Sequence, residues 1–529
     1  MTAPRTVSRP LAAVLAAGAL SLLVAGCGVF GPGDRTDSAS TPARGSTPVG
    51  SAPVTSGASR TAGVPARLRA FYGQRLRWTS CRTHMQCARL RVPLDYARPG
   101  GRSIEVALLK VPALDPARRI GSMVVDPGGP GASGVDYAAA AETAFGPRLR
   151  QRYDVVGLDP RGVGLSTPIE CGSDARLDRL FDYDPDPETA AERRTVDRMF
   201  RAVGRGCLRH DPQLLRHVST GEVARDLDVL RAALGDARLT YFGACYGTAI
   251  GTAYAERFPT RVGRMVLDGA MDPRVSTVRL NLVQARGFED ALRSYVGACV
   301  DKGGCFLGAT VDAGVRTIQA LLRRAETSPL RSTSGDPVTA GMVNYGITYP
   351  LYAQTLWPLL DRALEQGLRG DGTILALLAD AYLHRDQDGH FKDNTFEAYD
   401  AVNCLDHDDG IRWDRVDALL PRFERASPTF GSAFASSLPA CTDWPVHSGR
   451  VGHAVDITGA PPVLVVGTTR DPATPLVWAQ ALSRQIHGSV LVTRDGDGHT
   501  GYQQGNACVD GTVEDYLVRG TVPDEDVSC

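Results

Sequence analysis

The 529-residue sequence lacks an excess of charge of either sign. It has 58 lysine and arginine residues against 59 aspartate and glutamate residues, and its formal net charge is −1. A nucleic-acid-binding domain is expected to carry a basic patch or stripe, so this balance predicts no nucleic-acid partner. We also find no internal repeat. The length is sufficient for a large core and for two or three structural units.

Signals for a metal or a dinucleotide are missing too. None of the twelve cysteines forms a C-x-x-C pair, the common spacing of zinc sites. Gly162-Val163-Gly164 lacks the third glycine and the helix start that a dinucleotide-binding loop needs. We therefore expect neither a metal nor an organic cofactor.

Long apolar runs are absent except at the N-terminus. Leu11 to Phe30 follows two arginines and has the layout of a signal peptide rather than of a membrane span. Val24-Ala25-Gly26-Cys27 resembles a bacterial lipobox, although an ordinary secretory signal with a chance cysteine is the alternative. We expect a lipoprotein signal peptide over 1–26, lipidation of Cys27, and a flexible tether rich in Ser, Thr, Pro and Gly over 27–66.

One short stretch organises the rest of the chain. A short β-rich run that begins at Leu239 ends at Gly243, Cys245 lies exposed just after it, and Gly247 opens a run of small residues typical of a helix. G-x-Cys-x-G is the pattern of a nucleophile elbow, with cysteine in place of the usual serine. Such a turn lifts the central side chain clear of the sheet and directs a helix N-terminus at any negative charge that develops there.

The remaining cysteines indicate disulfides. An exported protein lies where disulfides persist. Setting aside Cys27 and Cys245 leaves ten cysteines, an even number. Sequence alone does not establish connectivity. Nearest-neighbour pairing gives Cys81–Cys87, Cys171–Cys207, Cys299–Cys305, Cys404–Cys441 and Cys508–Cys529, and leaves Cys245 as the free thiol.

Apolar strands alternate with helices up to about residue 275. Examples are the strands Ser122 to Val125 and Tyr153 to Leu158, and the amphipathic helix Glu222 to Leu234. This alternation predicts a mostly parallel, doubly wound sheet with helices on both faces. The helical pattern of 276–455 indicates an inserted cap or an independent domain. The strand pattern resumes at Pro462, which favours insertion between core parts 67–275 and 456–529.

The ends of two strands in the last segment carry an acid and a histidine, the two side chains that a catalytic triad needs besides the nucleophile. Asp471 follows the strand that begins near Pro462, and His499 follows the next strand. The order nucleophile, acid, histidine after successive strands is that of the α/β-hydrolase fold. We expect His499 to take the thiol proton and Asp471 to orient the ring. Asp495 and Asp497, in the histidine loop, are rival acids.

An oxyanion hole is expected from two backbone segments. Gly128 and Gly129 lie in a glycine-rich loop after a short strand, where backbone can approach a substrate without a Cβ in the way. Tyr246, directly after the nucleophile, supplies the second N–H.

These stretches resemble the secreted tripeptidyl aminopeptidases, relatives of proline iminopeptidase. The resemblance implies release of short peptides, tripeptides in particular, from a free N-terminus, with the cap closing over the substrate. The family has serine where this chain has Cys245, and commonly asparagine where this chain has Asp126. The matching segments, in family order, are Val92 to Tyr96, Pro127 to Gly131, Asp159 to Gly164, the elbow, Gly467 to Pro475 and Asp495 to Thr500.

An aminopeptidase must bind an ammonium group, and a carboxylate of the cap is the expected partner. The cluster Asp400, Asp406, Asp408 and Asp409 offers candidates, of which we select Asp406; a solvated acidic loop is the alternative.

We therefore predict an exported, monomeric hydrolase with peptide substrates, attached to the outer face of the cell membrane by lipid only, or secreted. An esterase, thioesterase or acyltransferase would use the same triad. A degenerate lipoprotein that only binds peptides is the other hypothesis, but a binding relic has no reason to keep Asp471 and His499.

Overall fold

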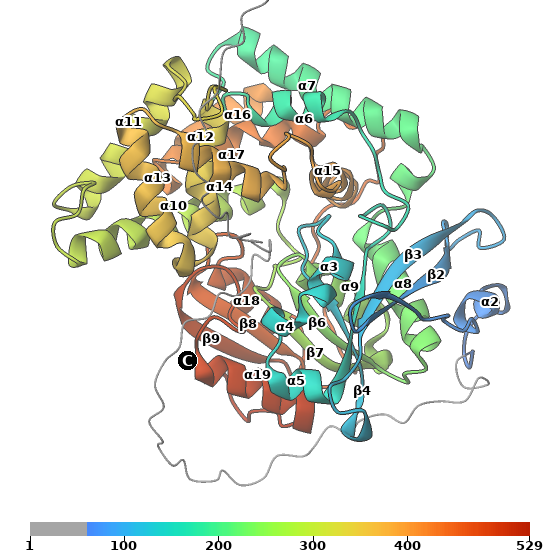
Figure 1. The fold of residues 1–529 in the computed structure, drawn as a ribbon. Coiled ribbons are helices and arrows are strands. Elements are labelled where there is room, and N and C mark those ends of the chain that lie inside the picture. Colours follow the sequence, from blue (N-terminus) through green and yellow to red (C-terminus); the bar gives the residue numbers. More distant parts are fainter. Residues whose placement is uncertain (1–60) are drawn as a thin grey trace, which may run out of the picture.

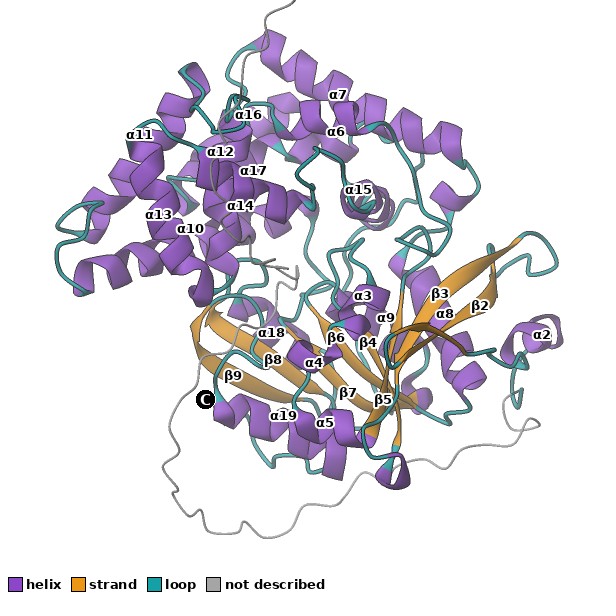
Figure 2. Ribbon diagram, in the orientation of Figure 1, coloured by secondary structure: helices purple, strands orange, loops and turns teal. Residues whose placement is uncertain are grey.

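The computed structural model describes residues 61–529. The predicted signal peptide, the lipidation site Cys27 and the tether up to residue 60 lie outside the described residues. A single sheet lies beneath a layer of helices, and further helices cover both of its faces (Figures 1 and 2). The strands are β1 (Thr79–Arg82), β2 (Met85–Pro93), β3 (Ser103–Val111), β4 (Gly121–Asp126), β5 (Tyr153–Leu158), β6 (Leu239–Ala244), β7 (Val262–Asp268), β8 (Leu464–Arg470), β9 (Val490–Asp497) and β10 (Val527–Ser528).

The strand order is β1-β2-β3-β5-β4-β6-β7-β8-β9-β10. The pairs β1–β2, β2–β3 and β3–β5 are antiparallel, and every other pair is parallel. The predicted α/β-hydrolase fold, with its mostly parallel sheet, is confirmed. Because parallel strands end at one edge, the loops after β4, β6, β8 and β9 meet there, and these loops carry the predicted site residues.

Two hydrophobic clusters fill the two faces of the sheet. Val124 and Tyr241 pack with α8 and α9 on one face, and Val125 and Phe242 pack with α3, α5 and α19 on the other. This follows from strand geometry, since successive side chains point to opposite faces. The core helices are α2 (Arg69–Tyr72), α3 (Gly134–Ala139), α4 (Ala141–Ala144), α5 (Pro147–Arg152), α8 (Thr220–Leu234), α9 (Gly247–Arg257), α18 (Leu476–Ser483) and α19 (Ala507–Arg519).

The remaining helices form the helical layer. It has its own hydrophobic cluster, which contains Leu177 and Phe181 of α6 together with residues of α10 to α14. Helices α6 and α7 lie in the layer (Figure 1) although they precede the elbow in sequence and lie within 67–275. Val203 and Cys207 of α7 pack instead with the cluster that contains α8 and α9. The helices of the layer are α6 (Asp174–Phe181), α7 (Ala190–His210), α10 (Thr277–Asp301), α11 (Val311–Thr327), α12 (Ala340–Thr348), α13 (Trp357–Leu368), α14 (Thr373–Leu383), α15 (Thr395–Asp406), α16 (Trp413–Ala426) and α17 (Gly431–Ser436).

Five disulfides close local segments of the chain. They are Cys81–Cys87, Cys171–Cys207, Cys299–Cys305, Cys404–Cys441 and Cys508–Cys529, which are the pairs that nearest-neighbour pairing predicts. Cys245 is the free cysteine of the described part of the chain. Within residues 61–529, none of the helices combines the length and the hydropathy that a bilayer span requires.

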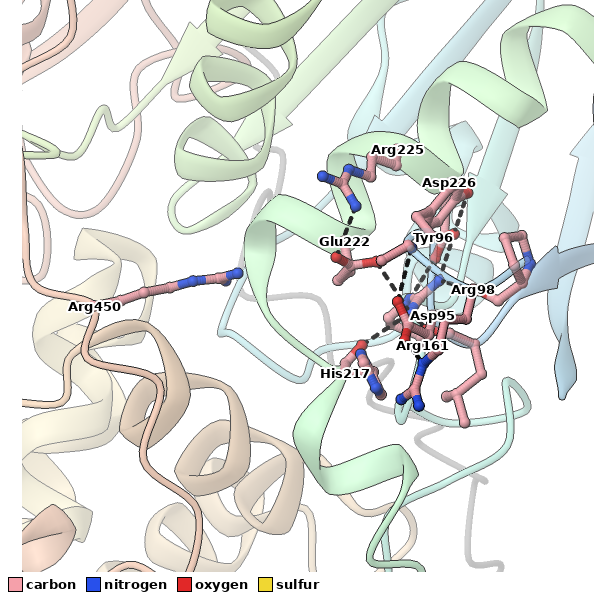
Figure 3. A network of polar contacts seen from close by, with 12 residues as sticks. Asp95, Tyr96, Arg98, Arg161, His217, Glu222, Arg225, Asp226 and Arg450 are labelled. Atoms are coloured by element: carbon pink, nitrogen blue, oxygen red, sulfur yellow. Dashed lines mark hydrogen bonds and ion pairs between the residues drawn. The ribbon is translucent and has the colours of Figure 1, made fainter. Parts of the chain in front are cut away.

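A buried arginine fixes the loop after β5 (Figure 3). The guanidinium of Arg161 is fully buried and donates to both carboxylate oxygens of Asp226 on α8, each at 2.7 Å. It also donates to the carbonyls of Pro93 and Leu94, at 3.0 and 2.8 Å. Tyr96 donates its hydroxyl to the same carboxylate at 2.8 Å. A buried charge is tolerated only when it is paired and hydrogen-bonded. This network therefore gives a structural role to two of the sequence motifs, Val92 to Tyr96 and Asp159 to Gly164.

Candidate active site

The elbow holds Cys245 in a conformation that few side chains adopt. Its φ is +53°, in the left-handed region, between the end of β6 and the start of α9. Its N–H donates to the carbonyl of Asp268 at 2.9 Å, and its carbonyl accepts the N–H and the hydroxyl of Thr248 at 3.0 and 2.6 Å. Such strain persists only where surrounding bonds over-determine it, and it is typical of functional sites.

Close backbone contacts explain the two glycines of the motif. A Cβ at Gly243 would lie 2.5 Å from the carbonyl oxygen of Gly247, and a Cβ at Gly247 would lie 2.5 Å from that of Asp126. Neither position has room for a side chain, so the pattern G-x-Cys-x-G is a packing requirement of this turn.

Asp471 and His499 meet at the ends of β8 and β9. Nδ1 of His499 lies 2.9 and 3.0 Å from the two carboxylate oxygens of Asp471. Asp471 also accepts the N–H groups of Ala473, Thr474 and Thr500 at 2.8 to 3.0 Å and the hydroxyl of Thr474 at 3.0 Å. The buried carboxylate is thus fully satisfied, and it fixes the tautomer in which Nδ1 carries the hydrogen.

The rival acids have a different partner. Asp495 and Asp497 accept from the guanidinium of Arg470, at 3.0 and 2.8 Å. The structure therefore brings Asp471, and neither rival, into hydrogen-bonding contact with His499.

The other nitrogen of His499 is buried and makes no hydrogen bond of ordinary geometry with the described residues. Burial opposes the charged form of the ring, but the charges of Asp471 and Cys245 outweigh it and raise the pKa of His499 well above its usual value. The sulfur is thus close enough to act on the ring. A histidine beside a cysteine can take the thiol proton, as in other cysteine nucleophiles.

The glycine-rich loop after β4 lies against the elbow. A Cβ at Gly128 would lie 2.4 Å from the backbone nitrogen of Tyr246. The N–H of Gly128 donates to Oδ1 of Asp126 at 2.9 Å, which leaves the N–H of Gly129 as the candidate from this loop. Tyr246 directly precedes α9, where backbone N–H groups face the helix N-terminus. Gly129 and Tyr246 therefore remain as the oxyanion candidates.

Asp126 itself is an unusual residue. It is 1% exposed, and its Oδ2 has no hydrogen-bond partner among the described residues. Burial raises the pKa of Asp126 to about 7, the N–H of Gly128 opposes this, and the charge of Asp159 adds to it.

Asp406, the acid selected from sequence, already has partners. Its Oδ2 accepts the N–H of Thr220 at 2.9 Å and the hydroxyl of Tyr246 at 3.0 Å, and its Oδ1 lies 3.6 Å from Arg450. These contacts join α15 to the elbow. Of the same cluster, Asp408 accepts from His447 and Gly449, and Asp409 accepts from Thr277.

Asp400 differs from the rest of this cluster. It makes no hydrogen bond or ion pair with the residues of 61–529, and burial together with the charge of Glu397 raises its pKa to about 7. Its charge also acts on Tyr345 and Tyr399, and the charge of Cys245 acts on Tyr399 as well. Tyr399 is thus within electrostatic range of both Asp400 and Cys245, and it keeps 40% of its surface exposed.

Sequence reasoning missed a group of tyrosines beside the site. The ring of Tyr352 meets that of His499 edge-on, with the ring centroids 5.5 Å apart. The backbone carbonyl of Tyr352 accepts the backbone N–H of His499 at 2.8 Å. Tyr382 lies 6.2 Å from Tyr352 and stacks on Tyr345 at 5.4 Å. Tyr345, Tyr349 and Tyr352 recur at helical spacing, and this pattern in the sequence could have indicated a group of tyrosines on one face of a helix.

Two cavities of the described residues are lined by residues other than Cys245, Asp471 and His499. One of about 440 Å³, lined by residues 300 and 303–309, lies at the end of α10. A second, of about 10 Å³, lies beside the glycine-rich loop and is lined by Gly128, Pro130 and Tyr246, among others. Residues 61–529 hold no cluster of three or more His, Cys, Asp or Glu side chains suited to a metal ion.

Comparison with known proteins identifies the family. The model of the TAP-like protein family matches residues 427–529. The chain is 38% identical over 488 residues to the serine protease Hip1 of Mycobacterium tuberculosis, covering 86% of this chain and 91% of that protein. It is 36% identical over 512 residues to carboxylesterase B of the same organism, covering 91% and 94%. It is 31% identical over 452 residues to tripeptidyl aminopeptidase of Streptomyces coelicolor, covering 84% and 83%. The chain belongs to the TAP-like family of α/β-hydrolases and is an enzyme of the hydrolase class.

Proposed function

We propose that the protein is a peptidase that releases short peptides, tripeptides in particular, from free N-termini, with Cys245, His499 and Asp471 as its triad. The names of two relatives, a serine protease and a tripeptidyl aminopeptidase, favour peptide substrates. The observation that carries the proposal is the state of His499, which is bonded to Asp471 through Nδ1 and interacts with Cys245.

The reaction follows from these positions. The thiolate of Cys245 attacks the carbonyl carbon of the scissile bond, while the thiol proton rests on Nε2 of His499. The N–H groups of Gly129 and Tyr246 stabilise the oxyanion. His499 gives the proton to the leaving amine as the C–N bond breaks, which leaves a thioester on Cys245. Water then loses a proton to His499 and attacks the thioester, and the released peptide acid and the restored thiol close the cycle.

The helical layer would act as the cap that recognises the free N-terminus. We assign the ammonium group of the substrate to Asp400 rather than Asp406, because Asp406 is committed to Thr220 and Tyr246. An ammonium ion would supply the missing partner of Asp400 and favour its charged form. The tyrosines between Asp400 and His499 would then line the path of the N-terminal residues.

A second candidate is an esterase, favoured by the relative named carboxylesterase B. The same thioester chemistry would serve a thioesterase or an acyltransferase. A chromogenic panel of tripeptides, N-acetylated tripeptides and short esters separates these activities. A strong preference for esters would remove the peptidase proposal.

The N-terminal segment adds a proposal about location. Lipidation at Cys27 would attach a monomeric enzyme to the outer face of the membrane through lipid alone, and cleavage of an ordinary signal would secrete it. Metabolic labelling with a lipid precursor, compared between the natural chain and Cys27→Ala, tests this point.

Intact-mass measurement tests the nucleophile. After incubation with a tripeptide ester, we expect an adduct with the mass of the tripeptidyl group on Cys245. It should be absent from Cys245→Ala and slower to form in His499→Ala, and the activity of Cys245→Ser should be measured in parallel. A protein that forms no adduct and no product with any substrate of the panel would be the peptide-binding relic.

A further inference from the structure

Asp268, the last residue of β7, is bonded to both halves of the site. Its backbone carbonyl accepts the N–H of Cys245 at 2.9 Å. Its carboxylate accepts the N–H of Gly501 on Oδ1 at 2.7 Å and that of Tyr502 on Oδ2 at 2.9 Å. These two N–H groups belong to the loop that carries His499. One residue thus connects the main chain of the nucleophile to the main chain of the base.

The residue that follows lies directly against the histidine. Gly269 has a φ of +66°, and a Cβ there would lie 2.9 Å from Oγ1 of Thr474 and 3.3 Å from Cε1 of His499. The backbone directly after β7 therefore lies close to the imidazole ring, and a shift of this turn would move the ring.

The carboxylate of Asp268 is placed to hold the loop, not to exchange protons with substrate. It is 1% exposed, and each of its oxygens is occupied by a backbone N–H. Burial raises the pKa of Asp268 to about 6, and the two N–H groups and the charge of His499 limit the rise. At neutral pH it is therefore an acceptor at both oxygens.

We propose that Asp268 is a positioning residue that sets the distance between the sulfur of Cys245 and the ring of His499. This inference rests on the proposed function of that pair. Asp268→Asn keeps the shape of the side chain but turns an NH₂ group toward a backbone N–H. Two donors then face each other, and the histidine loop must shift.

The test is the rate at which iodoacetamide alkylates Cys245 at pH 7, followed by intact mass, because it reports the thiolate without any knowledge of the substrate. We expect Asp268→Asn to slow alkylation about 10-fold to 100-fold, the range seen when outer partners of a site's ligands are removed. The matched control is Asp272→Asn. Asp272 is also buried, lies four residues on, and bonds Arg274 and Gln485 without touching the histidine loop. The control should alkylate at the natural rate.

A double-mutant cycle separates positioning from a general loss of structure. In a His499→Ala background, Asp268→Asn should cause no further slowing, because its effect passes through the ring. If the natural chain and His499→Ala alkylate equally fast, the proposed function fails. If His499→Ala is slow but Asp268→Asn is not, or if the two effects multiply, only the role of Asp268 is overturned. Near-ultraviolet circular dichroism checks the fold, and Asp268→Ser replaces Asp268→Asn in the same series if that variant does not fold.

Discussion

Two carboxylates of this protein, one buried and one half-buried, have opposite surroundings. Asp471, at the end of β8, accepts three backbone N–H groups, a hydroxyl and the ring of His499. Asp400, on α15 of the helical layer, accepts none from the residues of 61–529, and its pKa rises to about 7. A carboxylate held by many donors is fixed in place before the substrate arrives. One without donors costs free energy until a partner comes, which is typical of a binding site that awaits a cation.

The comparison assigns the two regions different tasks. In the proposed function, the strand ends of the sheet carry the reacting groups and the helical layer carries a carboxylate that pairs with the substrate. If this is right, changes at the sheet edge reduce turnover of every substrate, and changes in the layer discriminate between substrates.

The largest effect is expected from Asp471→Asn. The amide would donate to Nδ1 of His499 and reverse its tautomer, so Nε2 could no longer accept the thiol proton. We expect kcat for tripeptides and for esters to fall together, by about 10³-fold to 10⁴-fold, as in other triads. Steady-state kinetics on both substrate classes measures this.

Asp497→Asn is the control for that variant. Asp497 is a rival acid that bonds Arg470. Its replacement should leave kcat within a few-fold of the natural value. Equal losses in the two variants would mean that His499 is not oriented by Asp471 in particular.

The second effect concerns Asp400→Asn. Loss of a charge-assisted bond to an ammonium group costs about 1.5–3 kcal/mol, so kcat/KM for tripeptides with a free N-terminus should fall about 10-fold to 100-fold. N-acetylated peptides and esters lack the ammonium group and should be unaffected.

Asp408→Asn, a change in a neighbouring carboxylate that is bound to His447, controls for a general effect of charge near the layer. A uniform loss of activity on all substrates in Asp400→Asn would assign this residue to structure. An unchanged kcat/KM for every substrate would refute the assignment of the ammonium group to Asp400 and make Asp406 the candidate again.

The two regions also differ in how far the sequence could predict them. Cys245, Asp471 and His499 each follow a strand, and parallel strands bring their ends together whatever the rest of the chain does. The positions of Asp400 and Asp406 depend on packing. They lie six residues apart on one helix, about 120° apart around its axis, so they do not face the same side. Nothing local distinguishes them, and the bond from Asp406 to Tyr246 spans 160 residues.

The same reasoning applies to α6 and α7. Their apolar stripes are those of any amphipathic helix, and the partner that covers Leu177 and Phe181 comes from segments more than 100 residues later in the chain. Disulfide pairing, in contrast, was predicted correctly because each bond closes a short segment of at most 37 residues.

The smallest effect is on stability, and it extends the comparison to Asp126. Its folded pKa of about 7 is raised above the ordinary 3.8, so the folded state disfavours the charged form. The contribution of Asp126 to the free energy of unfolding is therefore largest below pH 4 and is lost as the pH rises towards 7. A rise of about three pKa units corresponds to roughly 4 kcal/mol at most. Asp126→Asn removes this titration and should raise Tm relative to the natural chain at pH 8 more than at pH 4.

Asp408→Asn should behave in the opposite way. The pKa of Asp408 is lowered, because bonds from His447 and Gly449 outweigh its burial. Its contribution to stability is therefore present at pH 4 and above, and it is lost only as the pH falls through the lowered pKa, so this variant should lower Tm at pH 4 and pH 8 and change it little at pH 2. Calorimetric scans of both variants from pH 2 to pH 8 give two slopes of opposite sign, below pH 4 for Asp408→Asn and above pH 4 for Asp126→Asn. Equal slopes would mean that Asp126 carries no buried charge at neutral pH, and that its unpartnered oxygen is protonated or bonded to a group that moves toward it.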